Sequence, residues 1–305
     1  MSKYKTPKIE ELLDAGVHFG HQTKRWHPKM EPYIFTARKN IHIINLEKTE
    51  EQLKKACDFL YETAKRGEQV IFVGTKKQAR EVIELESKRC GALYVTERWI
   101  GGTITNFKII KKNIDKLLTL MKRREEGDLE KYTKKERLLI DREIEKLLRN
   151  IGGIVNMKGV PGAVLVVDSR REKTAVREAK RFGVPVVGLI DTNSDPSLVD
   201  YVIPGNDDAI KSVALLLKAV SDAVEEGYKE FAKKGSDAEK AVEAAKVEEK
   251  TSVPETPKVS VAEAVRVAEE PVIDETAVKI EEVPAEVVKP SKAKKVKVVD
   301  KEEEK

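Results

Sequence analysis

The chain has 305 residues, and its 58 Lys and Arg residues exceed its 53 Asp and Glu residues by five. With 40% hydrophobic residues, it is long enough for one substantial core of about 150 to 230 residues. It contains no run of about 18 apolar residues and no signal-peptide core, which excludes a membrane-spanning protein and predicts a cytosolic one.

The distribution of charges and cysteines indicates the kind of partner and the cellular compartment. Residues 235–305 hold 13 Lys and Arg against 18 Asp and Glu, whereas residues 1–234 hold 45 against 35. A basic body of this kind predicts a polyanionic partner. Cys57 and Cys90 lack metal-ligand spacing, so we expect them to be small buried residues in a reducing compartment.

The N-terminal region begins with a short amphipathic helix over Lys8–Ala15, which Gly16 ends. The next residues, Val17–Met30, mix glycines, aromatics, histidines and basic residues, and they are too irregular for a periodic element. We expect a loop there, and we expect Ile34 and Phe35 to return to the core.

Strands and helices alternate through most of the remaining chain. The expected strands are Ile41–Asn45, Gln69–Val73, Leu93–Val95, Ala163–Asp168, Val184–Asp191 and Tyr201–Ile203. The expected helices are Thr49–Arg66, one that follows Gly74–Lys77 and reaches Arg89, Arg171–Phe182, and Asn206–Glu226. Several strands are continuous apolar runs, which is typical of parallel strands buried on both faces. The alternation predicts an α/β fold with a three-layer, doubly wound parallel sheet.

An antiparallel helical hairpin is predicted as an insertion over residues 103–151. Apolar residues spaced alternately by three and four form one stripe on each arm, namely Phe107, Ile110, Ile114, Leu117 and Met121, and then Ile140, Ile144, Leu147 and Ile151. This pattern is the seam of a coiled coil, and Thr133–Glu136 is a capping box that starts the second arm. Residues 105–150 hold 14 Lys and Arg against 9 Asp and Glu, so a basic arm of about 30 Å would project from the body.

These elements divide the chain into four segments. Residues 1–102 are the first part of the α/β body, 103–151 the hairpin, 152–234 the second part of the body, and 235–305 a tail. The tail repeats Ala, Val, Glu, Lys and Pro without aromatic residues, so its burial cannot offset the entropy of ordering. We predict that it is disordered.

The loop that spans residues 18–29 is the main candidate for a binding site. Its basic residues can pair with phosphates and its rings can stack on unpaired bases, and these residues are Lys24, Arg25, Lys29, Trp26 and His27. The alternative is a surface loop whose aromatic residues simply pack on the body. All four histidines lie within the first 42 residues, but no cysteine or carboxylate completes a zinc-ligand set, so we predict no metal site.

Five aspartates lie near strand ends or helix starts, namely Asp168, Asp191, Asp195, Asp207 and Asp208. Ligands bind at that edge of open α/β folds, so these carboxylates could hold Mg²⁺ in an enzyme or a receiver-like switch. The alternative, helix capping, fits better, because Asp195 precedes Pro196 at an expected helix start. Gly74–Lys77 lacks the spacing of a phosphate-binding loop. With no catalytic set elsewhere, we predict no enzymatic activity, no cofactor and no small-molecule substrate.

Seven segments carry more specific motifs. They are Ala15–Thr23, Trp26–Met30, Ile41–Leu46, Phe72–Lys76, Arg98–Thr103, Asp191–Pro196 and Ile203–Ala209. In this order they resemble the bacterial small-subunit ribosomal protein S2 family, over roughly residues 4–230. The resemblance implies a flavodoxin-like body with a coiled-coil protrusion, placed between the head and body of the small ribosomal subunit. It also implies binding to 16S rRNA and help in docking the large mRNA-binding ribosomal protein.

The resemblance extends the candidate RNA-binding residues to the base and arms of the hairpin. The predicted set is His18, His21, Lys24, Arg25, Trp26, Lys29, Arg38, Lys39, Lys76, Arg98, Trp99, Asn106, Lys108, Lys111, Lys112, Lys134, Lys135 and Arg137. The expected partners are 16S rRNA and neighbouring small-subunit proteins, in the cytoplasm. We expect neither a membrane partner nor a homo-oligomer.

Overall fold

A computed structural model describes residues 4–251 of the chain. The main sheet has five parallel strands in the order β5-β4-β6-β7-β8. Their bounds are β4 Val70–Val73, β5 Leu93–Val95, β6 Ala163–Val167, β7 Val186–Ile190 and β8 Tyr201–Pro204. If these strands are numbered from the first, the order is 2-1-3-4-5, which is the flavodoxin-like form of the doubly wound sheet. The predicted α/β class with a doubly wound parallel sheet is confirmed.

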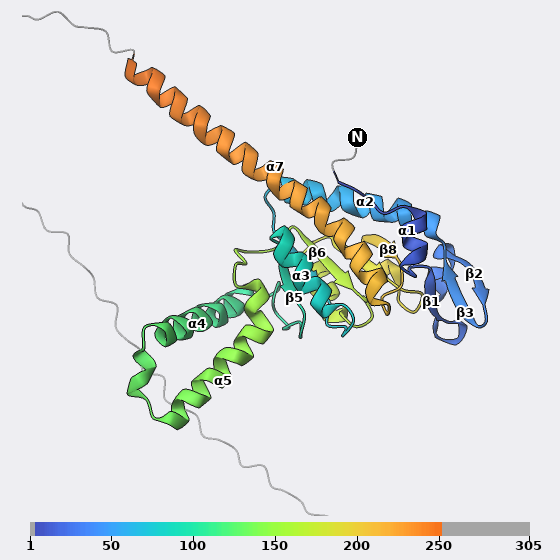
Figure 1. Ribbon diagram of the computed structural model, residues 1–305, viewed down its shortest axis with the longest axis horizontal. Helices are drawn as coiled ribbons and strands as arrows, with labels where there is room; N and C mark the ends of the chain where they lie inside the picture. Colours follow the sequence, from blue (N-terminus) through green and yellow to red (C-terminus); the bar gives the residue numbers. More distant parts are fainter. Residues whose placement is uncertain (1–3, 252–305) are drawn as a thin grey trace, which may run out of the picture. The chain divides into compact units, whose positions relative to one another are not determined.

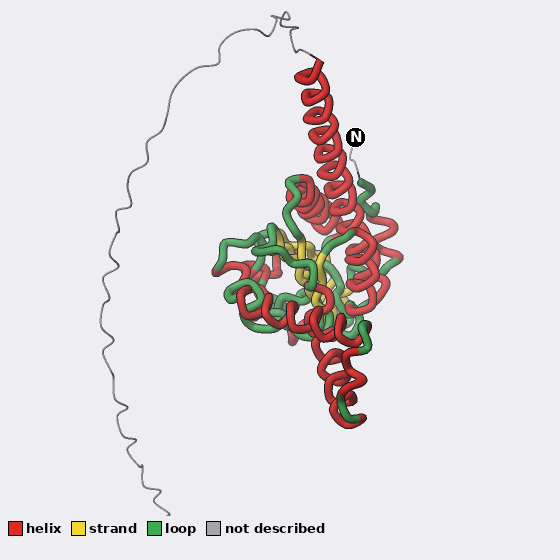
Figure 2. The backbone as a smooth tube through the Cα atoms, turned by 90° about the vertical axis from the view of Figure 1, so that its left-hand side faces the viewer, coloured by secondary structure: helices red, strands yellow, loops and turns green. Residues whose placement is uncertain are grey.

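Helices cover both faces of this sheet, as Figures 1 and 2 show. One face carries α1 (Ile9–Asp14), α2 (Leu46–Lys65), α3 (Arg80–Cys90) and α7 (Ile210–Thr251), and the other carries α6 (Lys173–Arg181). The strands supply both cores because successive side chains point to opposite faces. In β4, Phe72 packs with the first group of helices and Val73 with the second. No helix in residues 4–251 has the length and apolar character needed to cross a bilayer.

The first three strands form a separate antiparallel sheet in the order β1-β3-β2. Their bounds are β1 Phe19–Gln22, β2 Ile34–Arg38 and β3 Ile41–Ile44. The expectation of a loop throughout residues 17–30 is therefore wrong in part, since that region contains β1 and two short 3₁₀ turns. The expected return of Phe35 to the core is also wrong. Its side chain is 73% exposed, in a strand in which four of the five residues are exposed.

The helical hairpin consists of α4 (Phe107–Glu125) and α5 (Lys134–Ile151), joined by a turn that includes a 3₁₀ segment at Asp128–Lys131. Figure 1 shows the two helices next to the β5 end of the main sheet. The predicted stripes pack together, with five members buried (Ile110, Ile114, Leu117, Ile144 and Ile151) and the other four packed against them. Ion pairs between Lys116 and Glu143 and between Arg124 and Asp141 join the two arms. Supercoiling of the arms stays a prediction.

Helix α7 begins at Ile210 and ends at Thr251, and so it is longer than the predicted Asn206–Glu226. Its backbone continues through the first part of the segment that was expected to be disordered. The physical reason is composition, because residues 237–250 consist mainly of Ala, Glu and Lys, which favour a helix without any core. The remainder of that predicted tail, residues 252–305, lies outside the described residues.

Candidate functional site

The N-terminal segment lies against the carboxyl edge of the main sheet, where it contacts the turn after β7. The amide of His27 donates to the Thr192 carbonyl at 2.7 Å, and the amide of His21 donates to the Thr192 hydroxyl at 2.8 Å. Gly20 is required by this contact, because a Cβ there would lie 2.7 Å from Thr192 Cγ2. The fold thus brings together residues that are about 170 positions apart in the sequence.

A charged cluster fills this junction. His21 Nδ1 lies 2.9 Å from Asp191 Oδ2, and His21 Nε2 lies 3.4 Å from Asp208 Oδ2. The Lys76 ammonium lies 2.7 Å from Asp207 Oδ1 and 2.6 Å from Asp208 Oδ1. Asp207 is fully buried, and its Oδ2 has no hydrogen-bond partner. The cluster therefore combines one imidazole, one ammonium and three carboxylates, of which two are buried.

Burial controls the electrostatics of this cluster. It raises the pKa of Asp207 to about 7, the Asp191 charge adds to this rise, and Lys76 opposes it. The hydrogen bond to Asp191 raises the pKa of His21 above its usual value, although burial acts in the opposite direction. Burial also tends to lower the pKa of Lys76, but the charges of Asp207 and Asp208 outweigh it and the pKa is raised.

The same cluster has the ligand types that divalent cations use. One ligand atom from each of His21, Asp191, Asp207 and Asp208 can be chosen so that all lie within 4.8 Å of one another. Imidazole nitrogen and carboxylate oxygen both bind zinc and related ions. No spacing in the sequence marks these four residues as one set, because only the fold joins His21 to the carboxylates near 191 and 207.

Zinc or cobalt ions are expected to raise the unfolding temperature of the protein by about 5 °C when they are in large excess over their dissociation constant. A cation that binds only the native cluster stabilises the folded state. The Asp207→Asn variant should show a much smaller rise, because it loses the buried anionic ligand. Thermal unfolding followed by circular dichroism measures this, and equal rises in both proteins would contradict metal binding at the cluster.

The remaining predicted carboxylates are caps, as the capping alternative proposed. Asp168 has a φ of 65°, and its Oδ1 accepts from the amides of Arg170 and Arg171 at 3.0 and 3.2 Å. Asp195 accepts from the Ser197 amide at 2.9 Å and from the Lys29 ammonium at 3.1 Å. Asp191, Asp207 and Asp208, in contrast, belong to the charged cluster. The capping interpretation therefore applies to only part of the set.

The crevice after β4 and β6, where flavodoxin-like folds bind ligands, is filled by the chain's own side chains. Glu172 is 4% exposed, and its Oε1 accepts from the Thr75 amide at 3.0 Å and from the Thr75 hydroxyl at 2.5 Å. Arg171 donates to the same hydroxyl at 2.8 Å. An anionic phosphate would meet a buried carboxylate here, so Gly74–Lys77 does not form a phosphate-binding loop.

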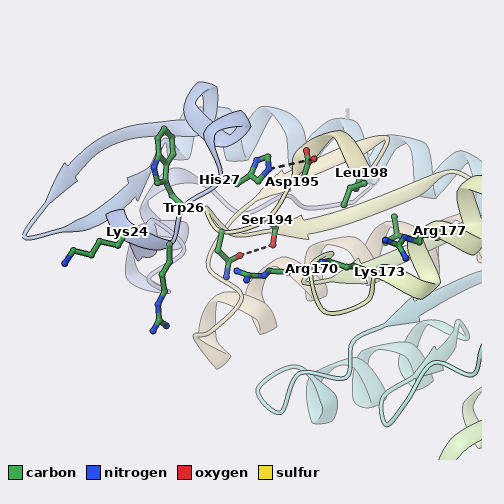
Figure 3. Close-up of a pocket in the computed structure, with 12 residues that line it drawn as sticks. Lys24, Trp26, His27, Arg170, Lys173, Arg177, Ser194, Asp195 and Leu198 are labelled. Atoms are coloured by element: carbon green, nitrogen blue, oxygen red, sulfur yellow. Dashed lines mark hydrogen bonds and ion pairs between the residues drawn. The ribbon is translucent and has the colours of Figure 1, made fainter.

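A groove of about 740 Å³ lies between the N-terminal segment and α6. Figure 3 shows Lys24 and Trp26 on one side, and Arg170, Lys173 and Arg177 on the other. The first side was predicted from the sequence, and the second was not. The signal that could have found it is the basic run after β6, in which the cations at 170, 173 and 177 are spaced by three and four residues.

The base of the hairpin is attached to α6 by Glu178, which is 9% exposed. Its Oε1 accepts from the Gly102 amide at 2.8 Å and from the Trp99 ring N–H at 3.3 Å. Its Oε2 accepts from the amides of Ile104 at 3.2 Å and Thr105 at 3.4 Å. A single carboxylate thus determines the course of the chain into α4.

The predicted RNA-binding residues fall into three groups by exposure. The exposed ones are Lys24, Arg25, Lys29, Arg38, Lys39, Arg98, Asn106, Lys108, Lys111, Lys112, Lys134 and Lys135. The partly buried ones are His18, His21, Trp26, Lys76 and Arg137. Trp99 is 6% exposed and packs in the core, so it has no ring face for a partner, and we leave it out of the proposed interface.

Comparisons with known proteins agree with the resemblance noted in the motifs. The family model described as Ribosomal protein S2 matches residues 12–227. A relative from Sorangium cellulosum, named small ribosomal subunit protein uS2, is 48% identical over 233 residues, covering 76% of this chain and 84% of that protein. A relative of the same name from Geotalea uraniireducens is 52% identical over 219 residues, covering 72% and 86%. The chain belongs to the ribosomal protein S2 family.

Proposed function

We propose that the protein is a structural component of the small ribosomal subunit that binds 16S rRNA between the head and the body and supports translation in the cytoplasm. Membership of the ribosomal protein S2 family supports this proposal, as do the names of its relatives. The family consists of structural, non-enzymatic proteins, which confirms the prediction that the chain is not an enzyme. The positions of the unpaired cations on the surface support RNA binding most directly.

The hairpin carries two kinds of cation. Four of its lysines and arginines have carboxylate partners within the hairpin, namely Lys116, Lys122, Arg124 and Lys131. The predicted RNA-binding cations make no ion pair with residues 4–129 or 131–234, and these are Lys108, Lys111, Lys112, Lys134, Lys135 and Arg137. Unpaired cations are available to displace counterions from phosphates, which is the main source of affinity for RNA backbones.

The small sheet supplies a second kind of surface. Phe35 is 73% exposed, Phe19 is 50% exposed and Ile41 is 38% exposed, and each comes from a different strand of that sheet. Exposed large apolar side chains that share one small sheet are candidates for contact with a protein partner. We assign this sheet to the contact with neighbouring small-subunit proteins, including the large mRNA-binding one.

Sedimentation of the native protein from a cell lysate tests the function. The protein should migrate with small ribosomal subunits, and treatment with RNase should return it to the top of the gradient. Migration as a free monomer at moderate salt without RNase would contradict a ribosomal role for this chain.

The Lys24→Ala/Arg25→Ala double variant is expected to bind 16S rRNA more weakly, with a salt slope reduced by about 1.4 to 1.8. Both side chains are exposed and unpaired, so each can release counterions on contact with a phosphate. Lys29→Ala should have a smaller effect, because its ammonium already pairs with Asp195. Filter binding at several salt concentrations measures the slopes, and an unchanged slope in the double variant would remove this segment from the interface.

A further inference from the structure

The groove between the N-terminal segment and α6 has cations on both sides, and the proposed function uses only those of the N-terminal segment. Five cations line it, and none of them makes an ion pair with any residue in the described part of the chain, namely Lys24, Arg25, Arg170, Lys173 and Arg177. Its one carboxylate, Asp195, already pairs with Lys29. Like charges gathered in this way repel one another, and a polyanion that occupies the groove removes the repulsion.

Other basic side chains of the α/β body have partners within the chain. Lys180, one turn further along α6, donates to the Ser197 carbonyl at 2.8 Å. On α3, Arg89 pairs with three carboxylates from its own helix and from α7. The cations at the groove share the lack of a partner with the hairpin cations, but they line one groove, where a single external anion can contact several of them.

The cations from α6 are spaced to follow a chain of phosphates. Lys173 and Arg177 are four residues apart, so they lie on one helical face and about 6 Å apart along the axis. Arg170 precedes them in the turn that Asp168 caps. Figure 3 shows the three side chains in succession along one side of the groove. A flexible RNA strand can place successive phosphates against these three side chains.

The groove also has an apolar and aromatic part. Val176 and Leu198 lie among its lining residues, and so does Trp26, which is partly buried. The Trp26 ring is held 5.0 Å from the ring of His42, measured between centroids. A volume of about 740 Å³ falls within the range of roughly 300 to 1,000 Å³ that is typical of sites for small organic ligands, so a nucleotide base fits.

We propose that this groove binds an unpaired stretch of RNA, with its phosphates on Arg170, Lys173 and Arg177 and one base packed beside Trp26. The inference rests on the proposed function, because it assigns a further segment of the same RNA to a second site. Unpaired nucleotides fit this lining better than a duplex, since only they can turn a base face toward an aromatic ring. An acidic peptide would pair with the cations, but it has no flat base to pack against Trp26, Val176 and Leu198.

Tryptophan fluorescence of the full-length protein provides the test. The chain has two tryptophans, and Trp99 is buried, so quenching by an added ligand reports on Trp26. A short single-stranded oligoribonucleotide should quench the emission, whereas the same sequence as a duplex should not. Trp26→Ala should bind the fluorescently labelled strand about tenfold more weakly, as expected for the loss of one stacked base.

The triple variant Arg170→Gln/Lys173→Gln/Arg177→Gln should lower the salt slope for the single strand by about 2. Its matched control is Lys54→Gln/Lys211→Gln/Lys218→Gln, which removes the same charge from exposed positions on α2 and α7, over the opposite face of the main sheet, and should leave that slope unchanged. Circular dichroism verifies that both variants fold.

Three outcomes would overturn the proposal. They are equal slopes in the triple variant and the wild type, equal quenching by strand and duplex, and displacement of the strand by an oligoglutamate peptide at equal charge. Binding of the wild-type protein and of the triple variant to full-length 16S rRNA, measured in parallel, distinguishes a failure of the groove proposal from a failure of the proposed function. If the rRNA binds equally well to the triple variant, only the groove is refuted. If wild-type protein does not bind the rRNA at all, the proposed function fails.

Discussion

Replacing Glu178 with Ala is expected to lower the free energy of unfolding by about 3 to 5 kcal/mol. The carboxylate accepts hydrogen bonds from four N–H groups, those of the Trp99 ring and of the amides of Gly102, Ile104 and Thr105. In the variant these donors lose their partner, and each buried N–H left without one costs about 1 to 3 kcal/mol. Urea unfolding followed by circular dichroism measures the loss.

Two further variants separate the hydrogen bonds from the charge. Glu178→Gln keeps one acceptor oxygen and places an NH₂ group against the other pair of donors, so we expect roughly half of the loss. Glu145→Ala, at an exposed position on α5, should change the free energy of unfolding by less than about 0.5 kcal/mol. A loss below about 1 kcal/mol in Glu178→Ala would mean that water replaces the carboxylate.

The same substitution has a consequence for RNA binding. Glu178 determines the course of residues 101–105, which lead directly into α4 with its unpaired lysines. If that segment loosens, the hairpin samples more orientations and must be ordered again on its partner, which weakens binding. Amide hydrogen exchange is therefore expected to increase at the start of α4 in Glu178→Ala, while the amides of β6 and β7 stay protected.

Long apolar patterns made the fold predictable. The strands β4, β6 and β7 are short runs of buried residues, and the two stripes of the hairpin keep one spacing along each arm. Such patterns report the local surroundings of each element, and many residues contribute to each one. The small antiparallel sheet was harder to predict, because strand β2 has four exposed residues out of five and so shows no alternation.

The site was less predictable because single residues from distant segments create it. Glu178 and the Gly102 amide are 76 positions apart, and His21 and Asp191 are farther apart still. No periodic pattern marks such a partner, and the same Asp residue type serves as a cap at position 168 and as a buried charge at position 207. Only the fold decides between these roles. The groove has the same origin, since its two sides come from residues 24–27 and residues 170–198, which are distant in the sequence.

The stability of the protein is expected to fall as the pH rises from about 4 to 7, by an amount on the order of a few kcal/mol attributable to Asp207. The pKa of Asp207 is about 7 in the folded protein, compared with 3.8 for the unperturbed group. Between these values the unfolded chain releases the proton that the folded chain retains, so rising pH favours unfolding. Below pH 3.8 and above about pH 7, Asp207 has the same protonation in the folded and unfolded chains, so it does not make the stability depend on pH.

Other groups also make the stability of the protein depend on pH. The raised pKa of His21 means that its protonated form adds stability that is lost only above pH 6.5, as the pH passes through the folded value. Burial opposes the pKa shift of Asp195, but the hydrogen bonds from Ser197 and the charge of Lys29 lower that pKa to about 2. Its contribution is therefore present above pH 3.8 and lost on further acidification. His18 and His42 act in the same window with the opposite sign, because burial lowers their pKa values and the unfolded chain binds more protons than the folded chain just below pH 6.5. The difference between the wild type and an Asp207 variant therefore isolates the contribution of Asp207.

The Asp207→Asn variant identifies the source of the fall, because asparagine has the same shape and does not titrate. Its free energy of unfolding should vary much less between pH 4 and 6.5, whereas Asp115→Asn, at an exposed position on α4, should keep the wild-type slope. The measurement is made in EDTA, since a bound cation would hold the cluster ionised and flatten the curve. An Asp207→Asn curve as steep as that of the wild type would assign the pH dependence to another group. A flat wild-type curve in EDTA would mean that Lys76 alone neutralises the buried carboxylate.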